Sequence, residues 1–184
     1  MAAMPIIFGF ANYLIPLQIG ARDLAFPRLN ALSYWLLPTG GIVIYMGYFT
    51  GGAGDVGWTG YTPYASNDAG LTGPTSPGTD FWVAGQIMLG ASSTLTAINF
   101  LTTMLRMRAP GMALMRMPLF SWSIFVTVFL LLLSIPVFTV ALILLMADRT
   151  FGTLYFDVNA GGDPILWQHL FWYFGHPEVY IVIL

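Results

Sequence analysis

The chain alternates between long apolar stretches and short polar connectors. The apolar stretches are residues 1–20, 31–49, 81–105, 119–147 and 165–184. Each has close to or more than the ~20 residues that a helix needs to cross the hydrocarbon core of a bilayer. They are apolar on all sides, unlike the surface helices of soluble proteins. The pattern therefore predicts an all-α fold, a polytopic transmembrane helical bundle with about five spans.

The composition excludes other broad classes. Hydrophobic residues make up 57% of the chain and charged residues 8%, whereas a soluble domain has about 25% charged residues. The high apolar content excludes disorder. The absence of cysteine excludes a disulfide scaffold and a thiolate metal site. Six scattered arginines in a chain of net charge -2 form no patch for nucleic acid.

The arginines also predict the orientation in the membrane. Two of the six lie in the first connector, three lie in the third, and only Arg149 lies in the fourth. By the positive-inside rule, the first and third connectors face the cytoplasm or matrix. The second connector, the outer loop 50–79, is long for a structureless loop. We expect it to form a compact cap on the outer face.

The two outermost apolar stretches lack the polar flanks of complete spans. The first opens directly at Met1, with no charged segment and cleavage site before it, which argues against a signal peptide. The last is still apolar at Leu184. We therefore expect an internal fragment of a longer membrane protein, with the first and last spans truncated.

The last span contains polar side chains on one stripe. His169, Trp172, His176 and Tyr180 are spaced at i, i+3, i+7 and i+11. His176 would lie ~18 Å along a helix that begins near Pro164, close to the middle of the bilayer. An imidazole there needs a metal, an ion pair or a hydrogen bond. The spacing leaves open a metal ligand or a packing histidine, and for His169 it favours an interfacial hydrogen bond.

Two neighbours of His176 suggest proton or electron transfer. Tyr180 lies one turn further, where its phenol can touch the imidazole. It could supply a proton or an electron, or it could be a core aromatic residue. Glu178 is the one carboxyl within an apolar stretch. A neutral carboxyl in hydrocarbon that ionises transiently suits a proton relay, which we favour over a structural hydrogen bond.

The third span has a polar stripe that could continue this relay. Ser92, Thr96, Asn99 and Thr103 follow helical spacing, and Ser93 lies beside them. Small hydroxyl residues also serve tight helix packing. Together with the polar residues of the first two spans and the first connector, however, the orientation predicts an inward-facing path to Glu178, with water bridging its gaps. The members of this path are Asp23, Asn12, Asn30, Asn99, Ser92 and Ser93.

These motifs resemble subunit I of the haem–copper cytochrome c oxidases. The resemblance rests on His-Pro-Glu-Val-Tyr at 176–180, on Trp-Gln-His-Leu-Phe-Trp at 167–172 and on the loop 23–30. It extends over essentially all of residues 1–184, which would be a partial subunit I domain. It would run from the end of the second helix to the first part of the sixth, out of twelve.

The resemblance implies roles for the residues of the last span. His176 would be one of three histidine ligands of the active-site copper, which faces a high-spin haem. Tyr180 would be covalently joined to His176 and would donate an electron and a proton as the O–O bond breaks. Trp172 would pack beside the copper site, and Glu178 would be the branch-point proton donor.

The resemblance also assigns the polar path and the outer loop. Asp23 would be the entry of a D-type proton pathway. Trp58 would lie near a haem propionate on the outer side. The resemblance assigns no role to the segment 64–78. The residues that would line the pathway after its entry are Asn12, Asn30, Ser92, Ser93 and Asn99.

The cofactors implied are a low-spin haem, a high-spin haem and copper. One histidine cannot hold copper, so the other ligands would lie outside residues 1–184, and the fragment alone would bind no metal and have no activity. The partners implied are other oxidase subunits, cytochrome c, O2, protons and membrane lipid, without nucleic acid. The segment Ile-Leu-Trp-Gln-His at 165–169 and the glycine-rich second connector favour a bacterial cell membrane over a mitochondrial inner membrane.

Three alternatives stay open at this stage. A quinol-fed oxidase shares these motifs, and the electron donor is set by other subunits. A nitric oxide reductase is disfavoured because Tyr180 directly follows His-Pro-Glu-Val. A proton-coupled transporter could use Glu178 and Asp23, but it would not need His176 and Tyr180 on one stripe.

Overall fold

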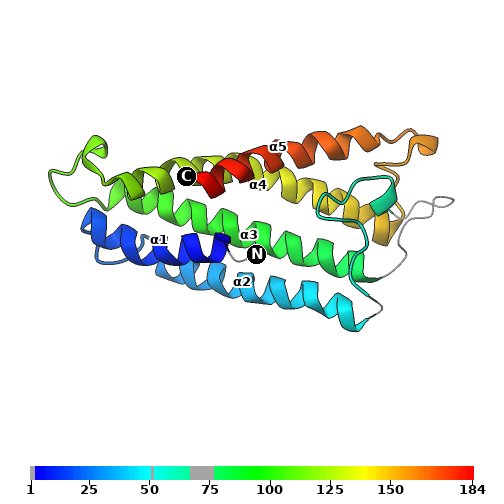
Figure 1. The fold of residues 1–184 in the computed structure, drawn as a ribbon, viewed down its shortest axis with the longest axis horizontal. Coiled ribbons are helices and arrows are strands. Elements are labelled where there is room, and N and C mark those ends of the chain that lie inside the picture. The colour runs from blue at the N-terminus through cyan, green and yellow to red at the C-terminus, as the bar shows by residue number, and fades with distance from the viewer. Residues whose placement is uncertain (1–2, 51, 67–76) are drawn as a thin grey trace.

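The computed structural model describes residues 3–50, 52–66 and 77–184, which form an elongated bundle of helices (Figure 1). No strand occurs among these residues, which confirms the predicted all-α fold. Residues 51 and 67–76 of the outer loop 50–79 lie outside the described residues, so the segment 64–78 is described only in part. The five α-helices are α1 (Ala3–Ile19), α2 (Pro27–Met46), α3 (Pro77–Arg106), α4 (Leu119–Phe151) and α5 (Pro164–Ile183).

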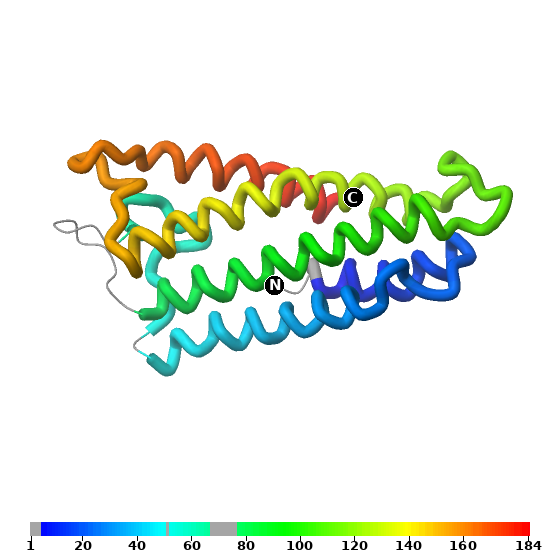
Figure 2. The backbone as a smooth tube through the Cα atoms, turned by 180° about the vertical axis from the view of Figure 1, so that it is seen from behind, coloured from blue at the N-terminus to red at the C-terminus, as the bar shows by residue number. Residues whose placement is uncertain are grey.

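Helices α2–α5 pack side by side in the order of the sequence. α2 packs on α3, α3 on α4, and α4 on α5, while α1 lies against α3 and α4 along one half of the bundle (Figure 2). The connectors after α1 and α3 lie at one end, and those after α2 and α4 lie at the other (Figure 1). The two arginine-rich connectors are therefore on the same side, as the charge pattern predicts.

Several helices extend beyond the predicted spans. α2 begins at Pro27 rather than at 31, because proline fits the first turn of a helix. α3 begins at Pro77 rather than at 81. α4 continues to Phe151 and ends at Gly152, whose φ of 65° is left-handed, so Asp148 and Arg149 belong to the helix and not to the connector. Charge therefore marked the end of the apolar stretch but not the end of the helix.

Length and apolarity together single out two helices of the described structure. α3 has 30 residues and α4 has 33, and both are apolar enough to cross a membrane. At 1.5 Å per residue they are about 45 and 50 Å long. α2 and α5, with 20 residues each, do not meet both criteria.

Aromatic packing fixes how α5 is rotated against α4. The ring of Phe138 on α4 stacks on Phe174, with centroids 4.6 Å apart, and meets Phe171 edge-on at 5.6 Å. Trp167 is fully buried and stacks on Phe171. These rings hold one face of α5 against the bundle, which leaves the opposite face turned outward.

Glycines allow α2 and α3 to approach closely. A Cβ added to Gly85 would lie 2.4 Å from Ile44 Cγ1 and 2.7 Å from the carbonyl oxygen of Gly40. A Cβ added to Gly40 would lie 3.0 Å from the carbonyl oxygen of Gly85. Backbone atoms cannot move aside as a flexible side chain can. Small residues of this kind are typical of close helix pairs in membranes.

We expect Gly85→Ala to destabilise the protein by about 1–3 kcal/mol, the usual cost of overpacking. Gly41→Ala is the matched control, since an added Cβ there has no atom within 4 Å. That control should be neutral or slightly stabilising, because alanine favours helix. Thermal unfolding of the two variants in the same detergent measures the difference. Equal melting temperatures would show that the glycine contact is not tight.

Candidate functional site

The predicted polar stripe of α5 lies on the face that points away from α4. His169, Trp172, His176 and Tyr180 are all exposed. The opposite stripe of α5, made of Trp167, Phe171, Phe174 and Ile181, is buried. Glu178 is half-buried and by helical spacing belongs to the buried stripe, four residues after Phe174 and three before Ile181. Helices α1–α4, as the structure describes them, therefore do not cover the stripe of α5 that contains the imidazole and the phenol.

His176 and Tyr180 are in contact. Their ring centroids are 4.6 Å apart and their planes are inclined by 72°. The helix continues through Pro177, so the i, i+4 spacing brings the two rings together. The imidazole and phenol rings are thus held against each other on one exposed face.

The described residues supply only part of a metal site. No group of three histidine, cysteine, aspartate or glutamate side chains lies close enough there to bind a metal ion. His169 is seven residues before His176, or about 10 Å along the helix. The His176 ring is exposed on an uncovered face rather than buried in the bundle. That placement fits a ligand of a metal whose other ligands come from elsewhere.

The cap segment, residues 52–66, packs on the outer half of α5. Trp167 Nε1 donates a hydrogen bond to the Thr59 carbonyl at 2.9 Å, and Trp172 Nε1 donates to the Tyr61 hydroxyl at 2.7 Å. Trp58 meets Trp172 edge-on, with centroids 5.8 Å apart. The structure thus brings together Trp58 and Trp172, the two predicted cofactor neighbours. It adds Tyr61, which the sequence reasoning missed although it lies only three residues after Trp58.

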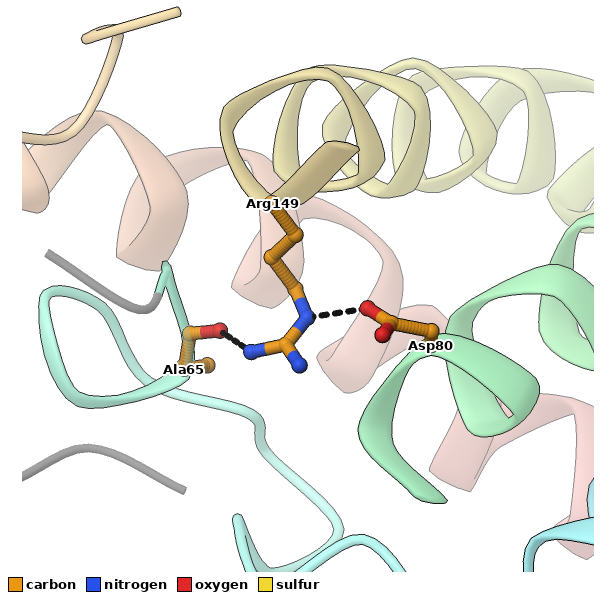
Figure 3. Close-up of polar contacts among 3 residues, drawn as sticks. All are labelled: Ala65, Asp80 and Arg149. Carbon is orange, nitrogen blue, oxygen red and sulfur yellow. Dashed lines mark hydrogen bonds and ion pairs between the residues drawn. The ribbon is translucent and has the colours of Figure 1, made fainter. Parts of the chain in front are cut away.

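A buried arginine connects the cap segment with α3 and α4 (Figure 3). The Arg149 side chain is 1% exposed, and its Nε lies 2.5 Å from Asp80 Oδ1. Its Nη1 donates to the Ala65 carbonyl at 2.8 Å. Sequence reasoning placed Arg149 in a connector. The signal for its burial was weak: a charged pair, Asp148 and Arg149, at the end of a long apolar stretch.

Asp148 is a second buried charge that sequence reasoning missed. Its carboxylate accepts hydrogen bonds from the Thr153 hydroxyl and from the backbone N–H groups of Tyr155 and Phe156. These bonds fold the connector after α4 back over the helix end. Asp148 therefore fixes the path of the chain toward α5.

The inner part of the predicted proton path is hydrogen-bonded to the first connector. Asn99 Oδ1 accepts from the Phe26 N–H at 2.9 Å, and Asn99 Nδ2 donates to the Phe26 carbonyl at 3.2 Å. Thr103 Oγ1 accepts from the Ala25 N–H at 2.9 Å. Asp23, three residues before Phe26, is exposed at the same end of the bundle. The segment 23–26 thus connects the two residues: it begins at Asp23, and its last residue, Phe26, is bonded to Asn99.

The other members of the path are less closely connected. Ser92 Oγ donates to the Ser33 carbonyl at 2.6 Å. Asn12 Nδ2 donates to the carbonyl of Phe8, whereas its Oδ1 is buried without a hydrogen-bond partner. Asn30 and Ser93 are partly buried. Within the described residues no hydrogen bond joins these side chains to Glu178, which lies on α5.

Comparison with known proteins matches the whole chain to one family. The family model described as "Cytochrome C and Quinol oxidase polypeptide I" matches residues 1–184. The chain is 52% identical over 183 residues to a protein named putative cytochrome c oxidase subunit 1-beta from Streptomyces coelicolor. It is 50% identical to cytochrome c oxidase subunit 1 of Bacillus subtilis and 48% identical to quinol oxidase subunit 1 of the same species.

These alignments cover 99–100% of this chain but only 31%, 29% and 27% of the three relatives. The chain therefore spans less than a third of the length of the relatives that it matches.

Proposed function

This chain belongs to the cytochrome c and quinol oxidase polypeptide I family, and from that premise we propose that it is part of the catalytic subunit of a terminal respiratory oxidase. The complete subunit would reduce O2 to water with electrons from cytochrome c and couple this reaction to proton pumping. The contact of the His176 and Tyr180 rings, 4.6 Å apart on the uncovered face of α5, is the observation that best supports this proposal.

The ligands available fit a metal centre that is shared with the rest of the subunit. When bound, copper and the two haems would supply the redox chemistry that delivers electrons to O2. His176 would donate one nitrogen to the copper, and the remaining ligands of the copper and of both haems would come from outside residues 1–184. These residues alone would therefore have no oxidase activity.

Tyr180 would hold a proton next to the metal ligand. Tyr180 is one helical turn after His176, so its phenol would release the proton at the site where O2 is reduced. Trp172 lies one turn before His176 on the same face, and the bond to Tyr61 fixes its indole ring. These aromatic groups would line the metal site and limit the entry of water.

Glu178 would hold a proton on the way to the same site. By helical spacing it belongs to the buried stripe of α5, so its proton would come from the side of the bundle. Protons would enter at Asp23 and pass along Asn12, Asn30, Asn99, Ser92 and Ser93. The unpaired Oδ1 of Asn12 is a place where a bridging water could bind.

The names of the relatives favour two electron donors. Proteins named cytochrome c oxidase and quinol oxidase both align over nearly the whole chain, at 50% and 48% identity. We propose cytochrome c as the donor and a quinol as the second candidate. Because the relatives are from Bacillus and Streptomyces, we propose a bacterial cell membrane as the location, with other oxidase subunits as partners.

We expect the purified full-length protein to contain haem and copper and to consume O2 when reduced cytochrome c is added. His176→Asn should lower the copper content by more than half and abolish turnover while the haem content persists, because only a copper ligand is removed. Metal analysis and oxygen-electrode measurements test this. His169→Asn is the matched control on the same helix. A copper content unchanged in His176→Asn would contradict the ligand role. Oxidation of a quinol in place of cytochrome c would select the second donor.

A further inference from the structure

Arg149 holds a positive charge inside the protein at the junction of three segments. Its guanidinium is bound by Asp80 of α3 and by the Ala65 carbonyl of the cap segment, and the residue itself is on α4 (Figure 3). A buried charge is tolerated only where its partners are well placed. The planar fork of arginine also fixes the directions of its bonds. The Arg149 side chain therefore constrains where Ala65 can lie.

From Ala65 a series of hydrogen bonds continues to α5. The Ala65 N–H donates to the Tyr61 carbonyl at 3.0 Å. The Tyr61 hydroxyl accepts from Trp172 Nε1 at 2.7 Å. Trp172 lies four residues before His176 on the same exposed stripe. Ala65 and Tyr61 thus link the buried guanidinium to the indole of Trp172, which is one helical turn before His176.

Two further bonds attach the cap segment to the beginning of α5. The Thr62 hydroxyl donates to the Pro164 carbonyl at 3.2 Å, and Trp167 Nε1 donates to the Thr59 carbonyl at 2.9 Å. Between Thr59 and Ala65 the cap segment therefore bonds to α5 at one side and to Arg149 at the other. A shift of the cap segment relative to α4 would move its contacts with α5.

We propose that Arg149 is a positioning residue for the stripe of α5, acting through Ala65 and Tyr61 on the orientation of the Trp172 ring. Arg149 touches no substrate or metal itself. The inference rests on the proposed function, since it assigns Arg149 a role in the surroundings of the site that contains His176. Asp80 is its counter-ion, and at 43% exposure this carboxylate keeps contact with solvent while the guanidinium does not.

The test uses the full-length protein with Arg149→Lys and Tyr61→Phe. Lysine keeps the charge but cannot bind two partners in the fork geometry of arginine. Tyr61→Phe removes only the acceptor for Trp172. We expect at least about a tenfold loss of kcat in Arg149→Lys, with KM for the electron donor unchanged, since small displacements of reacting groups have effects of this size. Arg116→Gln is the control, because the Arg116 side chain is exposed and its Nη1 makes a long bond of 3.5 Å to the Gly111 carbonyl.

Two further measurements separate positioning from mere stability. The first is the infrared stretch of carbon monoxide bound at the reduced metal centre, which should shift or split in both variants and not in Arg116→Gln. The second is hydrogen exchange of peptides from the cap segment, which should rise in Arg149→Lys only. Faster exchange with an unshifted carbon monoxide band would overturn the inference and leave Arg149 a structural residue. If Arg149→Lys does not assemble, an unshifted band in Tyr61→Phe overturns it equally. Absence of the band from the unmodified protein would contradict the proposed function instead.

Discussion

Glu178→Gln in the full-length protein is expected to lower O2 consumption at least about 100-fold while the haem and copper contents stay unchanged. Proton transfer by one positioned side chain contributes 10²–10⁴-fold to a rate in typical enzymes, which sets this estimate. Glutamine has nearly the same size and can still form hydrogen bonds, but it cannot release a proton. The half-buried position of Glu178 tolerates the amide, so the helix should pack as before. Oxygen-electrode traces and optical spectra of the same samples measure both properties.

Asp157→Asn serves as the control for this experiment. Asp157 lies in the connector after α4, where its carboxylate accepts a hydrogen bond from the Asn159 N–H, far in sequence from the proposed proton path. Its substitution should leave turnover within about twofold of the unmodified protein, as is usual for surface changes. Full turnover in Glu178→Gln would remove the relay role and leave a structural carboxyl.

Tyr180→Phe should remove both the proton at the end of the stripe and the covalent link that the family resemblance implies. The link would replace one hydrogen on each ring by a bond between the rings, with the two electrons taken up by O2 during turnover. The contact of the two rings at 4.6 Å is consistent with such a bond. We expect a peptide spanning Gly175–Leu184 to be lighter by two hydrogen atoms in active protein and to have the ordinary mass in the variant. Turnover should fall at least about 100-fold.

Tyr34→Phe is a suitable control, since Tyr34 is an exposed tyrosine of α2 and lies on none of the proposed paths. An ordinary mass for the 175–184 peptide from fully active protein would show that no link forms. Tyr180 would then act, if at all, as a simple proton donor. High turnover of Tyr180→Phe would exclude that second role as well.

The hydrophobic pattern was sufficient to predict the helices, and the distribution of arginines was sufficient to predict which connectors lie at the same end of the bundle. The five apolar stretches correspond to α1–α5, because in lipid each stretch must satisfy its own backbone by forming a helix. Helical spacing also brought His176 and Tyr180 together correctly, since an i, i+4 pair on one helix needs no tertiary information.

Contacts between distant segments could not be predicted in this way. The pairing of Arg149 with Asp80 joins residues 69 positions apart, and nothing in either local pattern selects the partner. The same is true of Tyr61 and Trp172. Conversely, Ser92 and Asn99 were expected to line a path and are found bonded to the backbone of α2 and of the first connector. Their polar side chains are used at least partly to hold helices together.

The length of α4 affects how the protein adapts to bilayers of different thickness. Its 33 residues measure about 50 Å, whereas the hydrocarbon core is ~30 Å thick, so tilt or protrusion must take up the excess. Since Arg149 is two residues from the end of α4, we expect its ion pair to lie near the level of the lipid headgroups, where the partly exposed Asp80 carboxylate can contact water. Bilayers of different thickness should therefore change the tilt of α4 while leaving this junction intact.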